Sequence, residues 1–213
     1  MIAENQLILD YLQRERFSSS TKLEHIYKTF KECSKDDANK RYLVTSQVKA
    51  IKFEKLTEWI CANNRKAADA MTFTDSNIIL IEFKAGDRTK GPWTKEKLIK
   101  SVIGKINDSD TTIYHDIVDN IDKLNSSDVR IAFYLVVDAV EMGIDSRSAV
   151  LLRLALGSQG LQDEKLEYLI NQLLPVLKDS TSNPEHFAEI DIWYSDIFDT
   201  YLQEYGIVDI SMR

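Results

Sequence analysis

The segment DAMTFTDSNIILIEFK, residues 69–84, ends in a predicted strand, IILIEFK at 78–84, whose apolar positions fall on both faces. Side chains alternate between the two faces of a strand, so the run IILIEF begins apolar on each side. Strands that are covered on both faces have this pattern. Glu82 and Lys84 share a face with Ile78 and Leu80, so burial of the apolar pair draws a carboxylate and an ammonium toward the interior.

The same segment is predicted to form an antiparallel hairpin around a polar turn. Whether the loop is 75–76 or 74–77, paired residue numbers add to 151 and Asp69 faces Glu82, whereas a three-residue loop would shift the register by one. Opposed Cβ atoms lie roughly 4.5 to 5.5 Å apart, where two carboxylates repel by ~3 kcal/mol at an effective dielectric near 20. Lys84 can neutralise one charge, and the remaining negative charge invites a proton or a metal cation.

Helical periodicity covers much of the remaining chain. The stretch VRIAFYLVV at 129–137 is the clearest strand. EIDIWY at 189–194 alternates like a strand inside a region that also keeps helical period, so both interpretations stay open. Thr21 and Glu24 form a capping-box pattern at the start of one predicted helix. The predicted helices are 3–15, 21–35, 46–63, 95–106, 110–124, 146–156 and 162–178.

This order of elements predicts an α/β protein with a central mixed sheet flanked by helices and with helical N- and C-terminal additions. We expect an N-terminal helical extension over 1–45 and an α/β core over 46–140. A mostly helical part over 141–213 is expected to pack on that core.

Composition places the chain among folded proteins, because 44% of its 213 residues are hydrophobic, 29% are charged, and only 7 are Gly and 3 Pro. The longest apolar run, IAFYLVV at 131–137, is far too short to span a bilayer, and MIAENQLILD lacks the features of a signal peptide. We therefore expect a cytoplasmic protein with no membrane partner. Cys33 and Cys61 have no metal-binding spacing and are expected to be buried or half-buried thiols.

The distribution of charge matters more than the net charge of -7, which by itself argues against a polyanionic partner. Residues 48–105 carry 12 basic and 7 acidic side chains, a local excess of +5 around the predicted hairpin. Residues 161–213 carry 3 basic and 11 acidic side chains, a net charge of -8. The hairpin region therefore remains compatible with a nucleic-acid partner.

Three pieces of sequence resemble the PD-(D/E)XK nuclease superfamily, which includes restriction enzymes and Holliday-junction resolvases. They are Glu54 in the helical context FEKL, Asp69 on the first hairpin strand, and IEFKAG at 81–86. The resemblance covers about 48–137 and implies a restriction-endonuclease-like core, with 95–106 and 129–137 as its next helix and strand. It also implies hydrolysis of phosphodiester bonds, with DNA the expected substrate, in restriction, repair or defence.

The resemblance further implies a role for each matched residue. Asp69 and Glu82 would bind Mg²⁺ or Mn²⁺ together with the backbone carbonyl of Phe83, Lys84 would position the attacking water, and Glu54 would act through water or a second ion. Magnesium prefers oxygen ligands and keeps several waters, so one or two carboxylates are enough to anchor it.

Two positions depart from the family pattern. Ala68 stands where the superfamily often has its name-giving Pro. Only 15 residues separate Glu54 from Asp69, which leaves little room for the strand usual between them. Either that strand is absent or displaced, or Glu54 is not the helical acid; Glu58, one turn later, is the substitute.

Further candidates for nucleic-acid contacts follow the hairpin. The lysines of the helix at 95–106 could meet phosphates, although an ordinary solvated face has the same pattern. Trp93 could stack on a base or could anchor its loop to the core. The residues expected to contact nucleic acid are Trp93, Lys95, Lys97 and Lys100.

Two alternatives to the nuclease stay open. In the first, Lys84 bridges Asp69 and Glu82 in a buried ion cluster without metal, although such clusters seldom repay their desolvation. In the second, the chain is a non-catalytic relative of the nucleases that binds nucleic acid or a protein partner. The acidic residues 161–213 could then form the contact surface or a homodimer interface.

Overall fold

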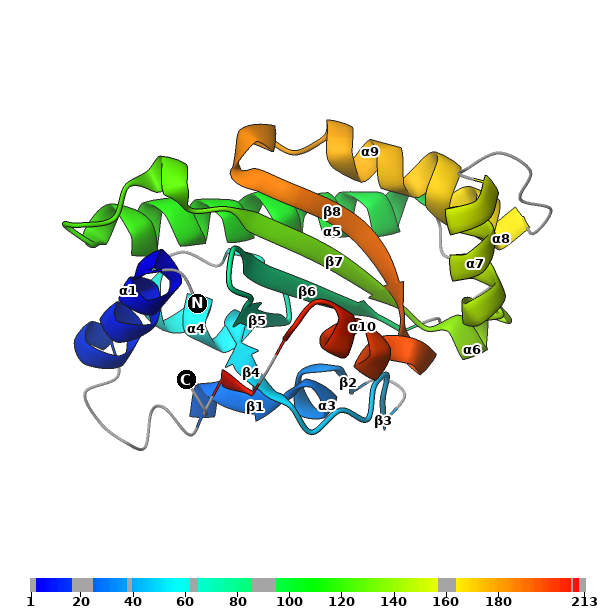
Figure 1. Cartoon of the computed structure of the whole chain (residues 1–213), viewed down its shortest axis with the longest axis horizontal. Coiled ribbons are helices and arrows are strands. Elements are labelled where there is room, and N and C mark those ends of the chain that lie inside the picture. The colour runs from blue at the N-terminus through cyan, green and yellow to red at the C-terminus, as the bar shows by residue number, and fades with distance from the viewer. Residues whose placement is uncertain are drawn as a thin grey trace.

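The computed structural model describes residues 3–16, 25–37, 40–61, 65–85, 95–156, 164–207 and 209–210. Its centre is a six-stranded mixed sheet in the order β1-β4-β5-β6-β7-β8, flanked by helices (Figure 1). A separate two-stranded sheet pairs β2 with β3. The strands are β1 Tyr27–Thr29, β2 Lys35–Asp36, β3 Arg41–Tyr42, β4 Lys49–Lys52, β5 Ala70–Phe73, β6 Ile78–Lys84, β7 Ile131–Val137 and β8 Phe187–Tyr194.

Helical segments connect the strands and cover the sheet. The connections between β6 and β7 and between β7 and β8 are both long and carry helices, as two parallel neighbouring strands require. The helices are α1 Ala3–Tyr11, α3 Phe30–Cys33, α4 Phe53–Ile60, α5 Lys95–Thr111, α6 Ala139–Met142, α7 Ser146–Leu156, α8 Glu164–Glu167, α9 Leu174–Asp179 and α10 Phe198–Glu204. The π- and 3₁₀-helical turns are η1 Leu12–Arg16, η2 Thr112–Ile117, η3 Val118–Asn120, η4 Ser126–Asp128, η5 Tyr168–Leu173, η6 Pro184–His186 and η7 Ser195–Ile197.

The hairpin register predicted from the sequence is confirmed. β5 and β6 pair antiparallel, with Phe73 opposite Ile78 and Ala70 opposite Ile81, so the paired numbers add to 151. The backbone N–H of Thr74 donates to the carbonyl of Asn77 across the loop. Next to the hairpin, β6, β7 and β8 run parallel. A strand with neighbours on both sides and helices on both faces is apolar throughout, and all seven residues of β7 are buried.

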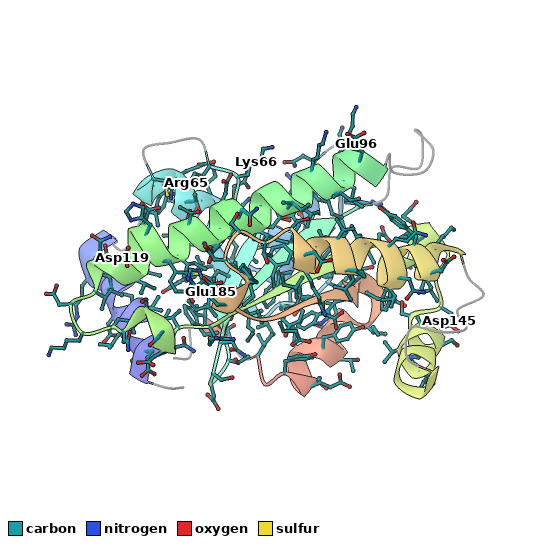
Figure 2. The ribbon with its side chains drawn as sticks, turned by 90° about the horizontal axis from the view of Figure 1, so that it is seen from above. Arg65, Lys66, Glu96, Asp119, Asp145 and Glu185 are labelled. Atoms are coloured by element: carbon teal, nitrogen blue, oxygen red, sulfur yellow. The ribbon has the colours of Figure 1, made fainter. Side chains whose placement is uncertain are left out.

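The two faces of β6 meet different helices. Phe83 points to the face covered by α3 and α10, where its ring lies 5.7 Å from that of Phe198 and the Phe198 ring lies 5.2 Å from that of Phe30. Glu82 points to the opposite face, over which α5 and α9 lie side by side (Figure 2). Both faces of β6 are therefore buried, as the sequence pattern indicates, and Glu82 is enclosed between the sheet and α5.

Two helices predicted near the N-terminus are wrong in part. Within 21–35 the chain forms strand β1 before α3 begins at Phe30, and within 46–63 strand β4 precedes α4. Thr29 and Glu32 form a capping box at the start of α3, since the Thr29 hydroxyl accepts from the Glu32 N–H and the Glu32 carboxylate accepts from the Thr29 N–H. The predicted box at Thr21 and Glu24 lies outside the described residues.

The strand pairing also changes the expected distribution of elements. β1 comes from the predicted helical extension 1–45, and β8 comes from the predicted helical part 141–213. EIDIWY belongs to β8, which settles the interpretation that the sequence left open. The α/β class with a mixed, helix-flanked sheet is confirmed, whereas the boundaries at 45 and 140 stay predictions.

Helices predicted at 95–106 and 110–124 form one helical run, in which α5 passes directly into η2 and η3. The helices predicted at 3–15, 146–156 and 162–178 are present as α1 with η1, as α7, and as α8, η5 and α9. Within the described ranges, none of the helices has the length and apolar character needed to cross a bilayer.

Candidate metal and nuclease site

The hairpin brings the predicted carboxylates together at one end of β5 and β6. Asp69 directly precedes β5 and stays within reach of the ladder, because its Oδ2 accepts a hydrogen bond of 2.7 Å from the backbone N–H of Phe83. Glu82 is fully buried on β6. The expected proximity of Asp69 and Glu82 is therefore present, and the backbone of Phe83 fixes the Asp69 side chain.

Lys105, one of the helix lysines considered above for phosphate contacts, joins the two carboxylates, a contact that the sequence did not predict. Lys105 Nζ donates to Asp69 Oδ1 at 3.0 Å and to Glu82 Oε2 at 2.7 Å. It comes from the middle of α5, the crossover helix that covers this face of the sheet. No local pattern in the sequence could indicate this contact, because Lys105 lies 36 residues from Asp69 and 23 from Glu82.

Lys84 lies on the other side of Glu82. Its Nζ is 2.6 Å from Glu82 Oε1, an ion pair whose direction does not suit a hydrogen bond, and this buried oxygen accepts no hydrogen bond from any described residue. The buried-cluster alternative placed Lys84 as the bridge between the carboxylates. In the structure Lys105 is the bridge, and Lys84 contacts Glu82 alone of the two.

Burial and charge shape the protonation of this cluster. Burial raises the pKa of Glu82 to about 7, and the nearby Asp69 charge adds to the rise while Lys105 and Lys84 oppose it. Burial alone would lower the pKa of Lys105, but Glu82 and Asp69 outweigh it and raise that pKa above its ordinary value. Two ammonium and two carboxylate groups balance, so the leftover negative charge inferred from the sequence is neutralised by Lys105.

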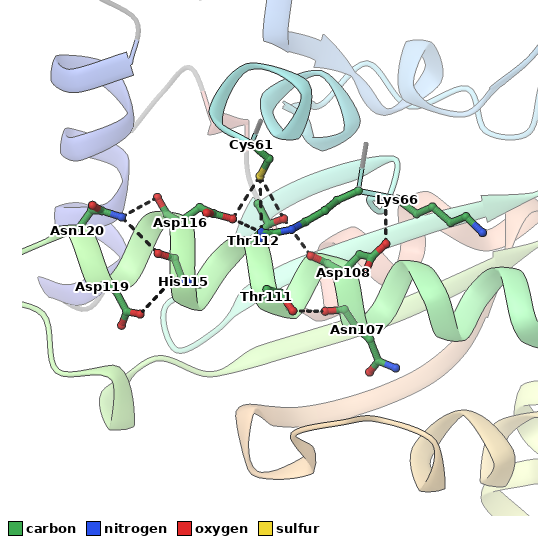
Figure 3. Close-up of polar contacts among 11 residues, drawn as sticks. Cys61, Lys66, Asn107, Asp108, Thr111, Thr112, His115, Asp116, Asp119 and Asn120 are labelled. Carbon is green, nitrogen blue, oxygen red and sulfur yellow. Dashed lines mark hydrogen bonds and ion pairs between the residues drawn. The ribbon is translucent and has the colours of Figure 1, made fainter. Parts of the chain in front are cut away.

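One face of α5 positions the segment that leads into Asp69. Asp108 accepts from the backbone N–H of Lys66 at 2.9 Å, and Ser109 accepts from that of Ala68 at 3.0 Å. One and two turns further, the helix contacts α4 and its C-terminal flank (Figure 3). The contacts there are Cys61 Sγ with Asp116 Oδ2 at 3.2 Å, Cys61 Sγ with Thr112 Oγ1 at 3.7 Å, and the ion pair of Arg65 with Asp116.

These contacts recur about once per turn, at 105, 108 and 109 on α5 and at 112 and 116 on η2, and so lie on one side of this helical run. Figure 2 shows Arg65 and Lys66 beside this helix. On a neighbouring side of α5, buried Asp110 contacts the α9–β8 connection. Its carboxylate lies 2.7 Å from His186 Nδ1 and 2.7 Å from Asn183 Nδ2. Helix α5 is therefore fixed from two sides, and Lys105 is presented by a rigid element.

The two candidates for the helical acid, Glu54 and Glu58, both lie on α4. Glu54 is in the first turn of α4 with an exposed side chain, and exposed Glu58 pairs with Lys55 at 2.6 Å. Neither has a described contact with Asp69 or Glu82. Strand β5 lies between β4 and β6 in the sheet, and β4 precedes α4 in the chain; among the described residues between α4 and β5, 61 and 65–69, there is no strand. The roles proposed for Glu54 and Glu58 stay predictions.

The predicted nucleic-acid contacts fall at the start of α5. Lys97 and Lys100 are exposed there, and Lys100 pairs with Glu96 at 2.7 Å on the helix surface. Lys95 begins the helix, and its side chain is outside what the structure describes. Trp93 also lies outside the described residues. Exposure makes Lys97 and Lys100 accessible to a polyanion without bringing them to the carboxylates.

The surroundings of the two cysteines raise the pKa of both thiols. Burial raises the pKa of the Cys33 thiol to about 12, and burial also raises the pKa of Cys61, with its hydrogen bond to Asp116 adding to that effect. Both are free, one buried and one half-buried, as the sequence predicts. Raised thiol pKa values disfavour the nucleophilic thiolate.

The donor set suits magnesium more than a tightly bound transition metal. Within the described ranges, no group of three or more His, Cys, Asp or Glu side chains is arranged to hold a metal ion. Magnesium, however, is bound by one or two carboxylates with water and other oxygen ligands. Asp69 and Glu82 provide such carboxylates, and one oxygen of each already shares a cation, the Lys105 ammonium, so a hard cation fits the chemistry of this site.

Comparison of the chain with protein-family profiles, curated proteins and solved structures finds no significant match.

Proposed function

We propose that this chain is a metal-dependent nuclease of the PD-(D/E)XK type that hydrolyses phosphodiester bonds, with DNA as the first substrate to test. One observation carries the proposal. The hairpin register and the Phe83 amide bring Asp69 beside the buried Glu82, and Lys84 lies next to them on the same strand face. The two acids and the lysine that the hairpin brings together are the residue types that metal-dependent phosphodiester hydrolysis needs.

Each side chain has a part in the proposed reaction. When bound, Mg²⁺ would hold a non-bridging phosphate oxygen and acidify a water. Asp69 and Glu82 would hold the cation together with the Phe83 carbonyl, as the family resemblance implies. The ammonium of Lys84 would position the attacking water, whose oxygen bonds to phosphorus as the bond to the leaving oxygen breaks. The attacking water gives up a proton to solvent, and the leaving oxygen takes a proton from solvent, so the protons balance.

The arrangement of elements supports a restriction-endonuclease-like core as part of the proposal. β4, β5 and β6 are consecutive antiparallel neighbours in the sheet, and α5 crosses over from β6 to the parallel strand β7. A helix and then a parallel strand therefore follow the hairpin, an order that supports this part of the proposal. The part in restriction, repair or defence follows from the resemblance alone.

A second candidate is favoured by one specific contact. Lys105 bridges the carboxylates and balances the cluster, which is the geometry of a structural ion network that needs no metal. In that case the chain is a non-catalytic module that binds nucleic acid or a protein partner. The acidic residues 161–213 are then the proposed contact or dimer surface.

Metal-dependent stabilisation separates the two candidates. We expect Mg²⁺ or Mn²⁺ to raise the melting temperature of the wild-type chain and to leave that of Asp69→Ala unchanged. The wild type should cleave duplex, branched or single-stranded DNA with metal and lose activity with EDTA, and the same substrates in RNA test the other nucleic acid. Glu82→Gln and Lys84→Met should each reduce cleavage by about 100-fold or more.

Lys178→Met is the matched control, because it removes an exposed lysine of α9 that is not among the residues expected to contact nucleic acid. It should retain cleavage within about two-fold of the wild type, as expected for a surface position. A wild type with neither a metal-dependent shift nor cleavage of any substrate contradicts the nuclease and favours the binding module. Equal cleavage by wild type and Glu82→Gln would point to a contaminating nuclease.

A further inference from the structure

The Lys105 ammonium occupies the position between Asp69 and Glu82 that a shared cation needs. It lies within 3.0 Å of an oxygen of each carboxylate, and its side chain is only 19% exposed. The other oxygens of the two acids are directed elsewhere: Asp69 Oδ2 toward the Phe83 amide and Glu82 Oε1 toward Lys84. Each carboxylate thus turns one oxygen toward the same point, and an amine holds that point.

We propose that Lys105 is a built-in counter-ion that takes the place of the divalent cation and is displaced when metal binds. This inference rests on the proposed metal site, and it adds that metal competes with a side chain of the chain itself. Lys105 is here a positioning residue: it keeps the two carboxylates together before metal arrives.

The distances make the exchange feasible with small movements. Magnesium–oxygen bonds are about 2.1 Å long, so each carboxylate oxygen would move by less than about 1 Å to replace the ammonium contact. Asp69 keeps its hydrogen bond to Phe83 through the other oxygen. The rigid anchoring of α5 keeps the backbone of Lys105 in place, while its flexible four-carbon stem lets the amine move toward solvent.

The exchange also changes the charge that a polyanion meets. With Glu82 ionised, Asp69, Glu82, Lys84 and Lys105 sum to zero without metal. One divalent ion raises the sum to +2, with the Lys105 ammonium released from its carboxylate partners. A phosphate group is therefore attracted to the loaded site and not to the empty one, so binding of metal and of nucleic acid should favour each other.

Lys105→Met tests the competition with Mn²⁺ alone as the probe. Methionine keeps a flexible chain of similar length without charge. By titration calorimetry we expect Lys105→Met to bind Mn²⁺ at least 10-fold more tightly than the wild type, and Lys100→Met to bind it as the wild type does. Without metal, Lys105→Met should melt at a lower temperature than the wild type, because the carboxylates then face each other unscreened.

The outcomes distinguish this inference from the proposed function. Equal or weaker binding of Mn²⁺ by Lys105→Met than by the wild type overturns the counter-ion and leaves the nuclease in place. Binding by Lys105→Met but not by the wild type supports the counter-ion and overturns the wild-type chain as a nuclease. If neither binds Mn²⁺, both proposals are overturned and the cluster is a structural ion network.

The wild-type chain allows a second test that does not depend on whether the variant folds. An amine-acetylating reagent, followed by peptide mass spectrometry, reports the accessibility of each lysine. We expect Mn²⁺ to increase the acetylation rate of Lys105 at least three-fold and to leave that of exposed Lys100 unchanged. An unchanged or lower rate at Lys105 in Mn²⁺, under conditions where calorimetry shows binding, overturns the displacement.

Discussion

Phe83 and Asp69 are joined by a hydrogen bond of 2.7 Å from the Phe83 backbone N–H to the Asp69 carboxylate. The bond extends the β5–β6 ladder by a side chain just where Asp69 leaves the strand. It fixes one oxygen of the acid and leaves the other for Lys105. The position of the proposed metal ligand thus depends on the backbone of the strand that supplies the second ligand.

Substitutions at Asp69 measure this bond. Asp69→Ala leaves the Phe83 N–H without an acceptor, which costs about 1 to 3 kcal/mol of unfolding free energy, whereas Asp69→Asn keeps an oxygen in place. Both variants remove the repulsion with Glu82, so the difference between their unfolding free energies reports the hydrogen bond to the Phe83 N–H. We expect Asp69→Asn to be more stable than Asp69→Ala by about 1 kcal/mol in urea denaturation. Identical urea midpoints for the two variants would show that the bond contributes nothing.

The titration of Glu82 predicts a pH dependence of stability. Because the folded pKa is raised from 4.5 to about 7, the folded state holds the Glu82 proton more tightly than the unfolded state does. This stabilisation is fully present below pH 4.5 and is lost as the pH rises through 7. Relative to Glu82→Gln, the unfolding free energy of the wild type should therefore fall by up to about 3 kcal/mol between pH 4.5 and 8.

Denaturation of the two proteins at a series of pH values in that range checks this expectation, and their shared histidines cancel in the comparison. Lys105 does not interfere, because its raised pKa makes its contribution fade only in strongly alkaline solution. Parallel stability curves for wild type and Glu82→Gln would contradict a raised pKa at Glu82.

Charge reversal at the start of α5 tests the predicted nucleic-acid contacts. If Lys97 and Lys100 meet phosphates, Lys97→Glu with Lys100→Glu should weaken binding of a DNA duplex by about 10-fold or more. The slope of log affinity against log salt should become shallower by about one for each phosphate that the variant no longer neutralises. Fluorescence anisotropy across a salt series measures both. Lys178→Glu, at an exposed position of α9, is the control and should bind as the wild type does.

The sequence was sufficient for the hairpin and for its two acids. The strict two-residue alternation and the polar turn specify a register that the structure reproduces, and the apolar run before Glu82 specifies burial on both faces. These are local properties, because a strand and its hairpin partner are close in the chain. For the same reason the chain pattern located β7, which is apolar throughout.

Contacts between distant segments were beyond the reach of such patterns. Lys105 looks like an ordinary basic residue of an amphipathic helix, and only the crossover of α5 over β6 brings it to Glu82. β4 carries a helical pattern in sequence and becomes a strand because β1 and β5 pair with it on both sides.

The row of polar contacts along α5 has a consequence for how the protein tolerates change. A single residue inserted between Lys105 and Asp108 would rotate all later positions by about 100° and shift them by about 1.5 Å. If Lys105 stayed over the carboxylates, Asp108 and Ser109 would turn away from the backbone of 66–68. If Asp108 and Ser109 kept those hydrogen bonds, Lys105 would turn away from the carboxylates. Homologous chains should therefore vary in the composition of this helix but keep its length between these positions unchanged.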